Sequence, residues 1–146
     1  MLNRLQGVFA SLNDHEVRYL ILGGIAAILH GVPRATFDLD ILIDPTEDNA
    51  RRLLAALLEA GLETAALIEF DQLLANEITV FSDFVRIDVL TKAPGLEFCE
   101  AWNRRQIMTY HNQPFNVVSK QDLIAAKRAS ARPVDLEDVR LLEMGE

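Results

Sequence analysis

Two aspartates, Asp38 and Asp40, interrupt an apolar segment and are the residues whose types and spacing most suggest chemistry. The segment 36–43 predicts a strand, in which side chains two residues apart point to the same side. Asp38 and Asp40 therefore project together, while Phe37 and Leu39 are directed to the core. Two adjacent carboxylates repel each other and are costly to bury, so the pair favours a divalent cation site. The alternative is an edge strand that uses charge to prevent aggregation, which the apolar neighbours disfavour.

A third aspartate, Asp88, lies in a second predicted strand at residues 84–90. If this strand pairs beside the first, Asp38, Asp40 and Asp88 meet on one face of the sheet. Mg²⁺ prefers oxygen ligands, and two such ions about 4 Å apart can hold the attacking and leaving oxygens of phosphoryl transfer. The simpler alternative is that Asp88 forms an ion pair with Arg86, which shares its face of the strand.

A glycine pair, Gly23 and Gly24, follows a predicted strand at 17–22 and precedes a short predicted helix at 25–30. Glycine has no Cβ, so backbone N–H groups at such a junction can approach a phosphate closely. Most glycine pairs only mark turns. The position of this pair, between a buried strand and the aspartate strand, favours a phosphate cradle.

These residues need a scaffold, and the sequence predicts one α/β domain over residues 1–146, with a core at about 17–118 and C-terminal helices at about 119–143. Apolar spacing and turn signals predict helices at 2–13, 25–30, 45–60, 96–105, 120–131 and 134–143. Asp44 is the expected cap of the third helix, and Ser119 that of the fifth. A hairpin is expected at 77–81 and 84–90, and two edge strands at 106–110 and 115–118. Residues 62–75 give no clear pattern.

The composition limits the classes of function. The 146 residues are 50% hydrophobic and carry a formal net charge of −8, which argues against broad binding to nucleic acid phosphates. No apolar run approaches the roughly 18 residues of a membrane span, so no membrane partner is expected. Cys99 is the only cysteine and cannot form an intrachain disulfide, which suits a reducing cytoplasm. Residues 119–132 form a basic island, which is the strongest candidate for a nucleotide or RNA contact.

Together the glycine pair, the Asp38-x-Asp40 motif and the later Asp88 resemble the nucleotidyltransferases of the DNA polymerase beta superfamily. The wider motif is similar to the branch that includes bacterial abortive-infection toxins, and it reads Gly23-Gly24-x-Ala26-x-x-x-His30-Gly31-x-x-Arg34-x-Thr36-x-Asp38-x-Asp40. The tail agrees, with Asp122-Leu123-Ile124-x-x-Lys127 followed by Arg132-Pro133-x-Asp135-x-x-Asp138. The resemblance covers most of residues 17–142. It implies a mixed, mostly antiparallel small sheet flanked by helices, with further helices at the C-terminus.

The resemblance also implies a role for each motif residue. Asp38 and Asp40 would bind Mg²⁺, with Mn²⁺ as an alternative, and the nucleoside triphosphate. Asp88 would hold the catalytic metal and help to deprotonate the acceptor hydroxyl. Gly23 and Gly24 would cradle the triphosphate, Arg34 and Thr36 would contact phosphate or orient the aspartate strand, and Lys127 would reach the triphosphate. From its helical position alone, Lys127 could equally lay its stem on the core with its tip in water.

Three functions from different classes are consistent with these motifs. The first is Mg-dependent transfer of a nucleoside monophosphate from a triphosphate to a hydroxyl on RNA, protein or a small molecule. The second is the toxin of a toxin–antitoxin pair, acting on transfer RNA or protein and held by an antitoxin partner. The third is a nucleotide-binding module without catalysis, for which Val134 is an argument because relatives often have lysine there. A homodimer fits the apolar composition, but no residue locates an interface.

Overall fold

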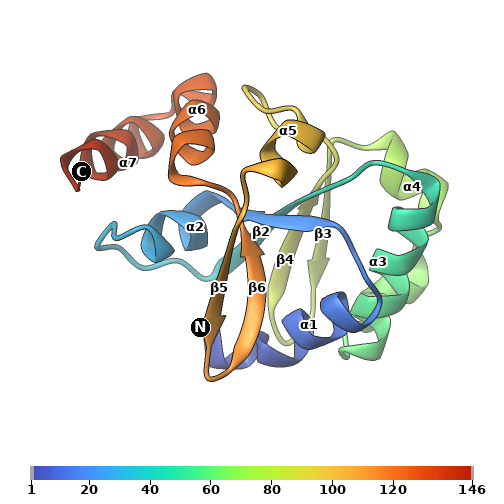
Figure 1. The fold of residues 1–146 in the computed structure, drawn as a ribbon. Helices are drawn as coiled ribbons and strands as arrows, with labels where there is room; N and C mark the ends of the chain where they lie inside the picture. The colour runs from blue at the N-terminus through green and yellow to red at the C-terminus, as the bar shows by residue number, and fades with distance from the viewer. Residues whose placement is uncertain (1, 146) are drawn as a thin grey trace.

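The computed structural model describes residues 2–145, in which six strands form one open sheet (Figure 1). The strands are β1 (Tyr19–Leu22), β2 (Asp38–Ile43), β3 (Ile78–Ser82), β4 (Arg86–Leu90), β5 (Gln106–Tyr110) and β6 (Gln113–Val117). Their order across the sheet is β3-β4-β2-β1-β6-β5. The pairs β2–β4 and β1–β6 are parallel, and the other neighbouring pairs are antiparallel. The prediction of a mixed, mostly antiparallel sheet is confirmed.

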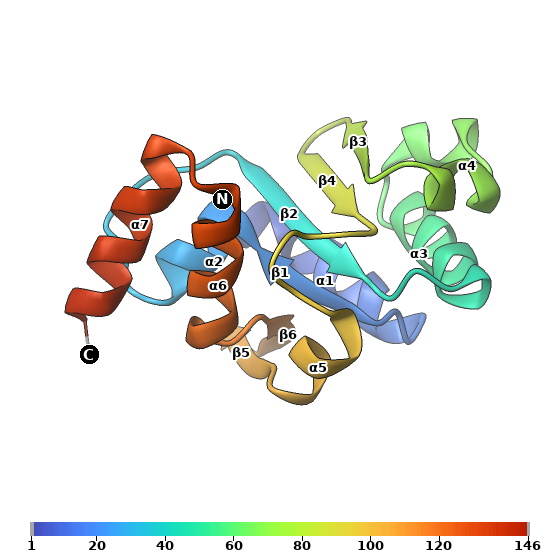
Figure 2. The same ribbon diagram turned by 90° about the horizontal axis from the view of Figure 1, so that it is seen from above.

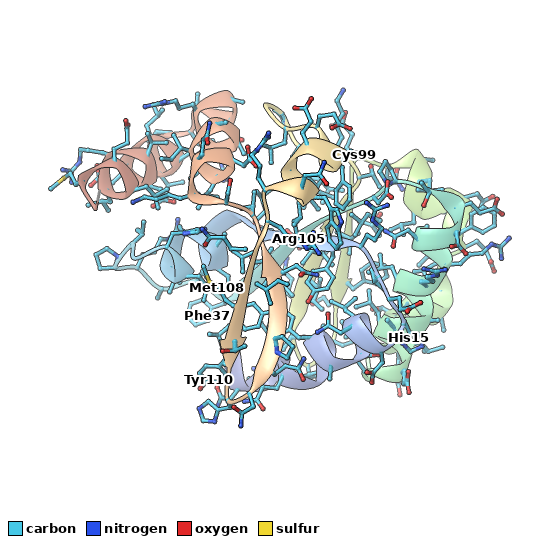
Figure 3. The ribbon with its side chains drawn as sticks, viewed as in Figure 1. His15, Phe37, Cys99, Arg105, Met108 and Tyr110 are labelled. Atoms are coloured by element: carbon cyan, nitrogen blue, oxygen red, sulfur yellow. The ribbon has the colours of Figure 1, made fainter. Side chains whose placement is uncertain are left out.

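The central strands explain where the aspartates lie. Every residue of β1 is buried, and β2 buries its apolar residues while its two aspartates are only partly buried. β2 lies between β1 and β4, so the edge-strand explanation for Asp38 and Asp40 is wrong. The expectation that Phe37 points to the core is also wrong. Phe37 precedes the first residue of β2, where no strand partner or helix covers it, and it is 81% exposed (Figure 3).

Helices cover both faces of the sheet (Figures 1 and 2). α1 (Leu2–Asp14) and α3 (Glu47–Glu59) pack together on one face, where Ser11 Oγ donates to the carbonyl of Ala56 at 2.6 Å. α5 (Phe98–Asn103) and α6 (Lys120–Ser130) lie over the other face, and α2 (Gly23–Leu29) and α7 (Pro133–Met144) contact α6. The short helices η1 (Glu63–Leu67) and α4 (Phe70–Ala75) form the segment that gave no clear sequence pattern. No helix within residues 2–145 is both long and apolar enough to cross a bilayer.

Two predicted boundaries differ from the structure for local reasons. α3 begins after Thr46, whose Oγ1 accepts from the N–H of Asn49 at 3.3 Å. Asp44 instead continues the end of β2, because its N–H donates to the carbonyl of Arg18 and its carboxylate pairs with the Arg18 guanidinium at 3.2 Å. β6 is not an edge strand, because it pairs with the free side of β1 and leaves the edge to β5. The β3–β4 hairpin and the Ser119 cap of α6 are confirmed.

Candidate active site

The parallel pairing of β2 with β4 brings the aspartates of the two strands together. In the register of this pair, Asp40 lies opposite Asp88, and Asp38 lies opposite Arg86. Strand alternation then places all four side chains on one face of the sheet. The side chains of Asp38 and Asp88 are 43% and 18% exposed, so this face is accessible to solvent. Asp88 is therefore adjacent to Asp40, as the sequence predicted if the two strands pair.

The face is strongly acidic around Asp40. Its pKa is raised to about 6, first because the carboxyl is largely desolvated and second because Asp88 and Asp38 are negatively charged. The positive charges of Lys127 and Arg132 oppose this shift but do not cancel it. Asp40 thus carries a charge that folding disfavours, and a cation bound beside it would relieve that cost.

Arg86 is a cation that already lies beside two of these carboxylates, those of Asp88 and Asp38. Its Nε donates to Asp88 Oδ1 at 3.0 Å and its Nη2 to Asp88 Oδ2 at 3.4 Å. The same Nε lies 3.8 Å from Asp38 Oδ2. The hydrogen bond to Asp88 and the surrounding carboxylates raise the pKa of Arg86 above its usual value. The ion pair foreseen as an alternative role for Asp88 is therefore present, and Arg86 is itself part of the site.

The positions and the chemistry of these carboxylates can be compared with what an Mg²⁺ site requires. Within residues 2–145, no three carboxylate, histidine or cysteine side chains lie close enough together to hold one ion. Arg86 bonds to one of the three carboxylates and lies near a second. The donor set of Asp38, Asp40 and Asp88 is nevertheless purely carboxylate oxygen, which Mg²⁺ accepts readily. Their mutual repulsion at Asp40 also suits a divalent cation, so the residues fit the expected metal.

Gly23 and Gly24 let the start of α2 approach this face closely. Gly23 has φ +66°, and a Cβ added there would lie 2.1 Å from Asp40 Oδ2. A Cβ on Gly24 would lie 3.1 Å from Thr36 Oγ1. Any other residue at Gly23 would therefore be strained and would displace the Asp40 carboxylate. The helix begins at this pair rather than after it, and no side chain within the described chain caps its first turn.

The cations predicted to contact phosphate lie on the opposite side of the same cleft. Lys127 Nζ is 2.8 Å from Asp138 Oδ2 and 3.7 Å from Asp135 Oδ1. Arg34 Nη1 donates to the same Asp138 oxygen at 2.6 Å. The Lys127 side chain is only 6% exposed, so the alternative of a lysine with its tip in open water is wrong.

The tail motif contained the partners of these cations, Asp135 and Asp138, but the sequence analysis assigned them no role. Arg132 holds Asp135 in a bidentate pair, with Nε to Oδ2 at 2.7 Å and Nη2 to Oδ1 at 3.1 Å. The Arg132-Pro133-x-Asp135 spacing at the start of a helix was the available signal. The basic island also divides in two, because Arg128 faces away from the cleft and pairs with Glu143 at 2.7 Å.

The residues to which the resemblance assigned a metal or nucleotide role all line one polar cleft, which Arg86, Arg132 and Asp135 complete. Carboxylates from β2 and β4 form one wall, and cations from α6, from the loop before β2 and from the start of α7 form the other. Asp38 at the beginning of β2 and Arg132 between α6 and α7 both line this cleft. A cleft with one acidic and one basic wall suits a polyanion that carries a metal cation.

Comparisons with solved structures give the same fold. A candidate nucleotidyltransferase from Thermotoga maritima aligns over 98% of this chain and 90% of its own, with a TM-score of 0.59 and 16% identity. An antigenic nucleotidyltransferase-like protein from Paracoccidioides brasiliensis aligns over 94% of this chain and 72% of its own, with a TM-score of 0.58 and 16% identity. At such low identity, these likenesses establish the fold alone.

Comparisons of sequence give the family. No curated protein matches the chain. A family model described as a nucleotidyltransferase of unknown function (DUF6036) matches residues 3–144. That match spans both walls of the cleft and nearly the whole chain, so the protein belongs to this family of nucleotidyltransferases.

Proposed function

We propose that this protein transfers a nucleoside monophosphate from a nucleoside triphosphate to an acceptor hydroxyl, with Mg²⁺ held by Asp38, Asp40 and Asp88. The observation that carries the proposal is the β2–β4 register, which sets Asp40 beside Asp88 across the cleft from Lys127. Membership of a nucleotidyltransferase family supports the general reaction.

The two walls of the cleft suggest how the work is divided. Bound Mg²⁺ would neutralise the triphosphate and lower the pKa of the attacking hydroxyl. Asp88, on the strand next to the edge strand β3, would take the proton of the acceptor hydroxyl. The acceptor oxygen then bonds to the α-phosphorus while the bond to pyrophosphate breaks. Lys127 and Arg34 would stabilise the charge on the departing pyrophosphate.

A second candidate is a module that binds nucleotides without transferring them. The Arg86–Asp88 ion pair favours it, because a permanent pair would withhold one carboxylate from the metal. This candidate predicts triphosphate binding that is indifferent to Mg²⁺, whereas the transferase predicts binding that weakens when the metal is chelated. Calorimetry with and without a chelator separates the two. The toxin hypothesis rests on resemblance alone, and harmless expression of the wild type would count against it.

The transferase is tested by labelling. The protein is incubated with Mg²⁺, each nucleoside triphosphate labelled at the α-phosphate, and cell extract as the source of acceptor. We expect the wild type to label an acceptor and Asp38→Asn and Asp40→Asn to lose that labelling. Asp122→Asn is the matched control, because Asp122 is buried and ion-paired with Arg104 outside the cleft. Equal labelling by Asp40→Asn and wild type would overturn the proposal.

A further inference from the structure

The start of α7 carries two aspartates that are almost completely buried. Asp135 and Asp138 are each 2% exposed. They lie three residues apart on one helix and therefore share a face, which is turned toward α6. Burying two carboxylates is costly, and a pair of apolar residues would hold the helix at lower cost. Their presence calls for an explanation beyond the packing of α7.

Both carboxylates are committed to cations from other parts of the cleft. Asp138 Oδ2 is 2.8 Å from Lys127 Nζ on α6 and 2.6 Å from Arg34 Nη1 in the loop before β2. Asp135 takes a bidentate pair from Arg132. Burial raises the pKa of Asp135, but the hydrogen bonds and charge of Arg132, with the charge of Lys127, bring it below the usual value. Asp135 is therefore a firm anion in the folded protein.

The network keeps capacity for a further anion. Three cations face two carboxylates, so one net positive charge remains on this wall. Within the described chain Arg34 makes one hydrogen bond through its side chain, although a guanidinium has five N–H donors. The Arg132 side chain is 71% exposed, and Lys127, Arg34 and Arg132 all line the cleft opposite Asp40. The free donors are thus available where the phosphates of a nucleotide would lie.

We infer that Asp138 and Asp135 are positioning residues that fix Lys127, Arg34 and Arg132 as a preformed wall for the phosphate tail of the nucleotide. The inference rests on the proposed function and deepens it, because it assigns the C-terminal helix to the nucleotide site. Ordering the cations before binding removes the entropy cost of ordering them on the ligand. The contribution of this wall to binding affinity should therefore increase with the number of phosphates on the nucleotide that reach it.

The test compares ligands that differ only in phosphate number. Calorimetry measures the Kd of ATP, ADP and AMP in the presence of Mg²⁺ for wild type, Asp138→Asn and the control Asp122→Asn. We expect Asp138→Asn to weaken ATP binding by about tenfold and AMP binding by less than about twofold. The Asp122→Asn control also loses a buried ion pair, with Arg104, but should leave both affinities unchanged.

Each other outcome contradicts the inference. Equal loss of ATP and AMP affinity would indicate a merely structural role for Asp138, and tighter ATP binding would indicate that the aspartate competes with phosphate. Wild type that binds none of the three ligands would overturn the proposed function and this inference together. If Asp138→Asn does not fold, Arg34→Gln replaces it, because Arg34 is partly exposed and its loss should show the same dependence on phosphate number.

Discussion

Replacing Asp40 by asparagine should make the protein more stable while abolishing its chemistry. The pKa of Asp40 is raised from 3.8 to about 6, chiefly by desolvation and then by the charges of Asp88 and Asp38. A shift of roughly two pKa units at about 1.4 kcal/mol per unit corresponds to about 3 kcal/mol, and partial exposure lowers this to about 2 kcal/mol. Asparagine has the same shape without the charge, so it removes this cost.

The gain has a defined dependence on pH. Above about pH 7 the carboxyl is ionised in both the folded and the unfolded chain, so wild type bears the full cost. Below about pH 3 it is protonated in both, and the cost vanishes. Because the folded pKa is the higher one, the contribution of Asp40 to wild-type stability is complete at low pH and is lost as the pH rises through about 6.

Urea denaturation with divalent ions chelated measures this directly. We expect Asp40→Asn to exceed wild type by about 2 kcal/mol near pH 8 and to match it near pH 3. Asp88→Asn is the control from the same site, and it should not be stabilised because it breaks the pair with Arg86. An Asp40→Asn protein that is less stable than wild type near pH 8, or a gain that persists in full near pH 3, would refute the electrostatic reasoning.

Two further changes probe the site. Gly23→Ala should cost about 1 kcal/mol through its positive φ and reduce transfer at least about tenfold by displacing Asp40. Gly31→Ala has φ +103° with nothing within 4 Å of the new Cβ, so it should lose stability but keep transfer, and equal loss of transfer in both would contradict this account. Arg86→Gln should tighten Mn²⁺ binding to the nucleotide-free protein at least about fivefold, because a like charge nearby costs roughly 1 kcal/mol even in water. Electron paramagnetic resonance measures the free Mn²⁺, and unchanged or weaker binding would argue against competition by Arg86.

The acidic wall could be predicted because its causes are local. Asp38 and Asp40 share a face through strand alternation, and the apolar residues around them indicate an internal strand. That Asp88 would join them depended on the order of the strands. The sequence indicated a hairpin but not that β4 would pair in parallel with β2.

The basic wall could be predicted only in part. Lys127 stood out by motif, but its contact with Asp138 spans the connection between two helices and depends on how α6 packs against α7. No periodicity within one helix reports such a contact. The capping of α3 shows the same limit on a smaller scale, because Asp44 and Thr46 are both good caps and the pair of Asp44 with Arg18 decides between them.

The central claim is that the cleft transfers a nucleoside monophosphate, and the fate of each phosphate tests it most directly. Wild type is incubated with Mg²⁺, cell extract and a triphosphate labelled in parallel reactions at the α- or the γ-phosphate. The account predicts that the α-label enters the acceptor and that the γ-label leaves as pyrophosphate, with both lost in Asp40→Asn. Transfer of the γ-label to the acceptor, or acceptor labelling that survives removal of Mg²⁺, would contradict it.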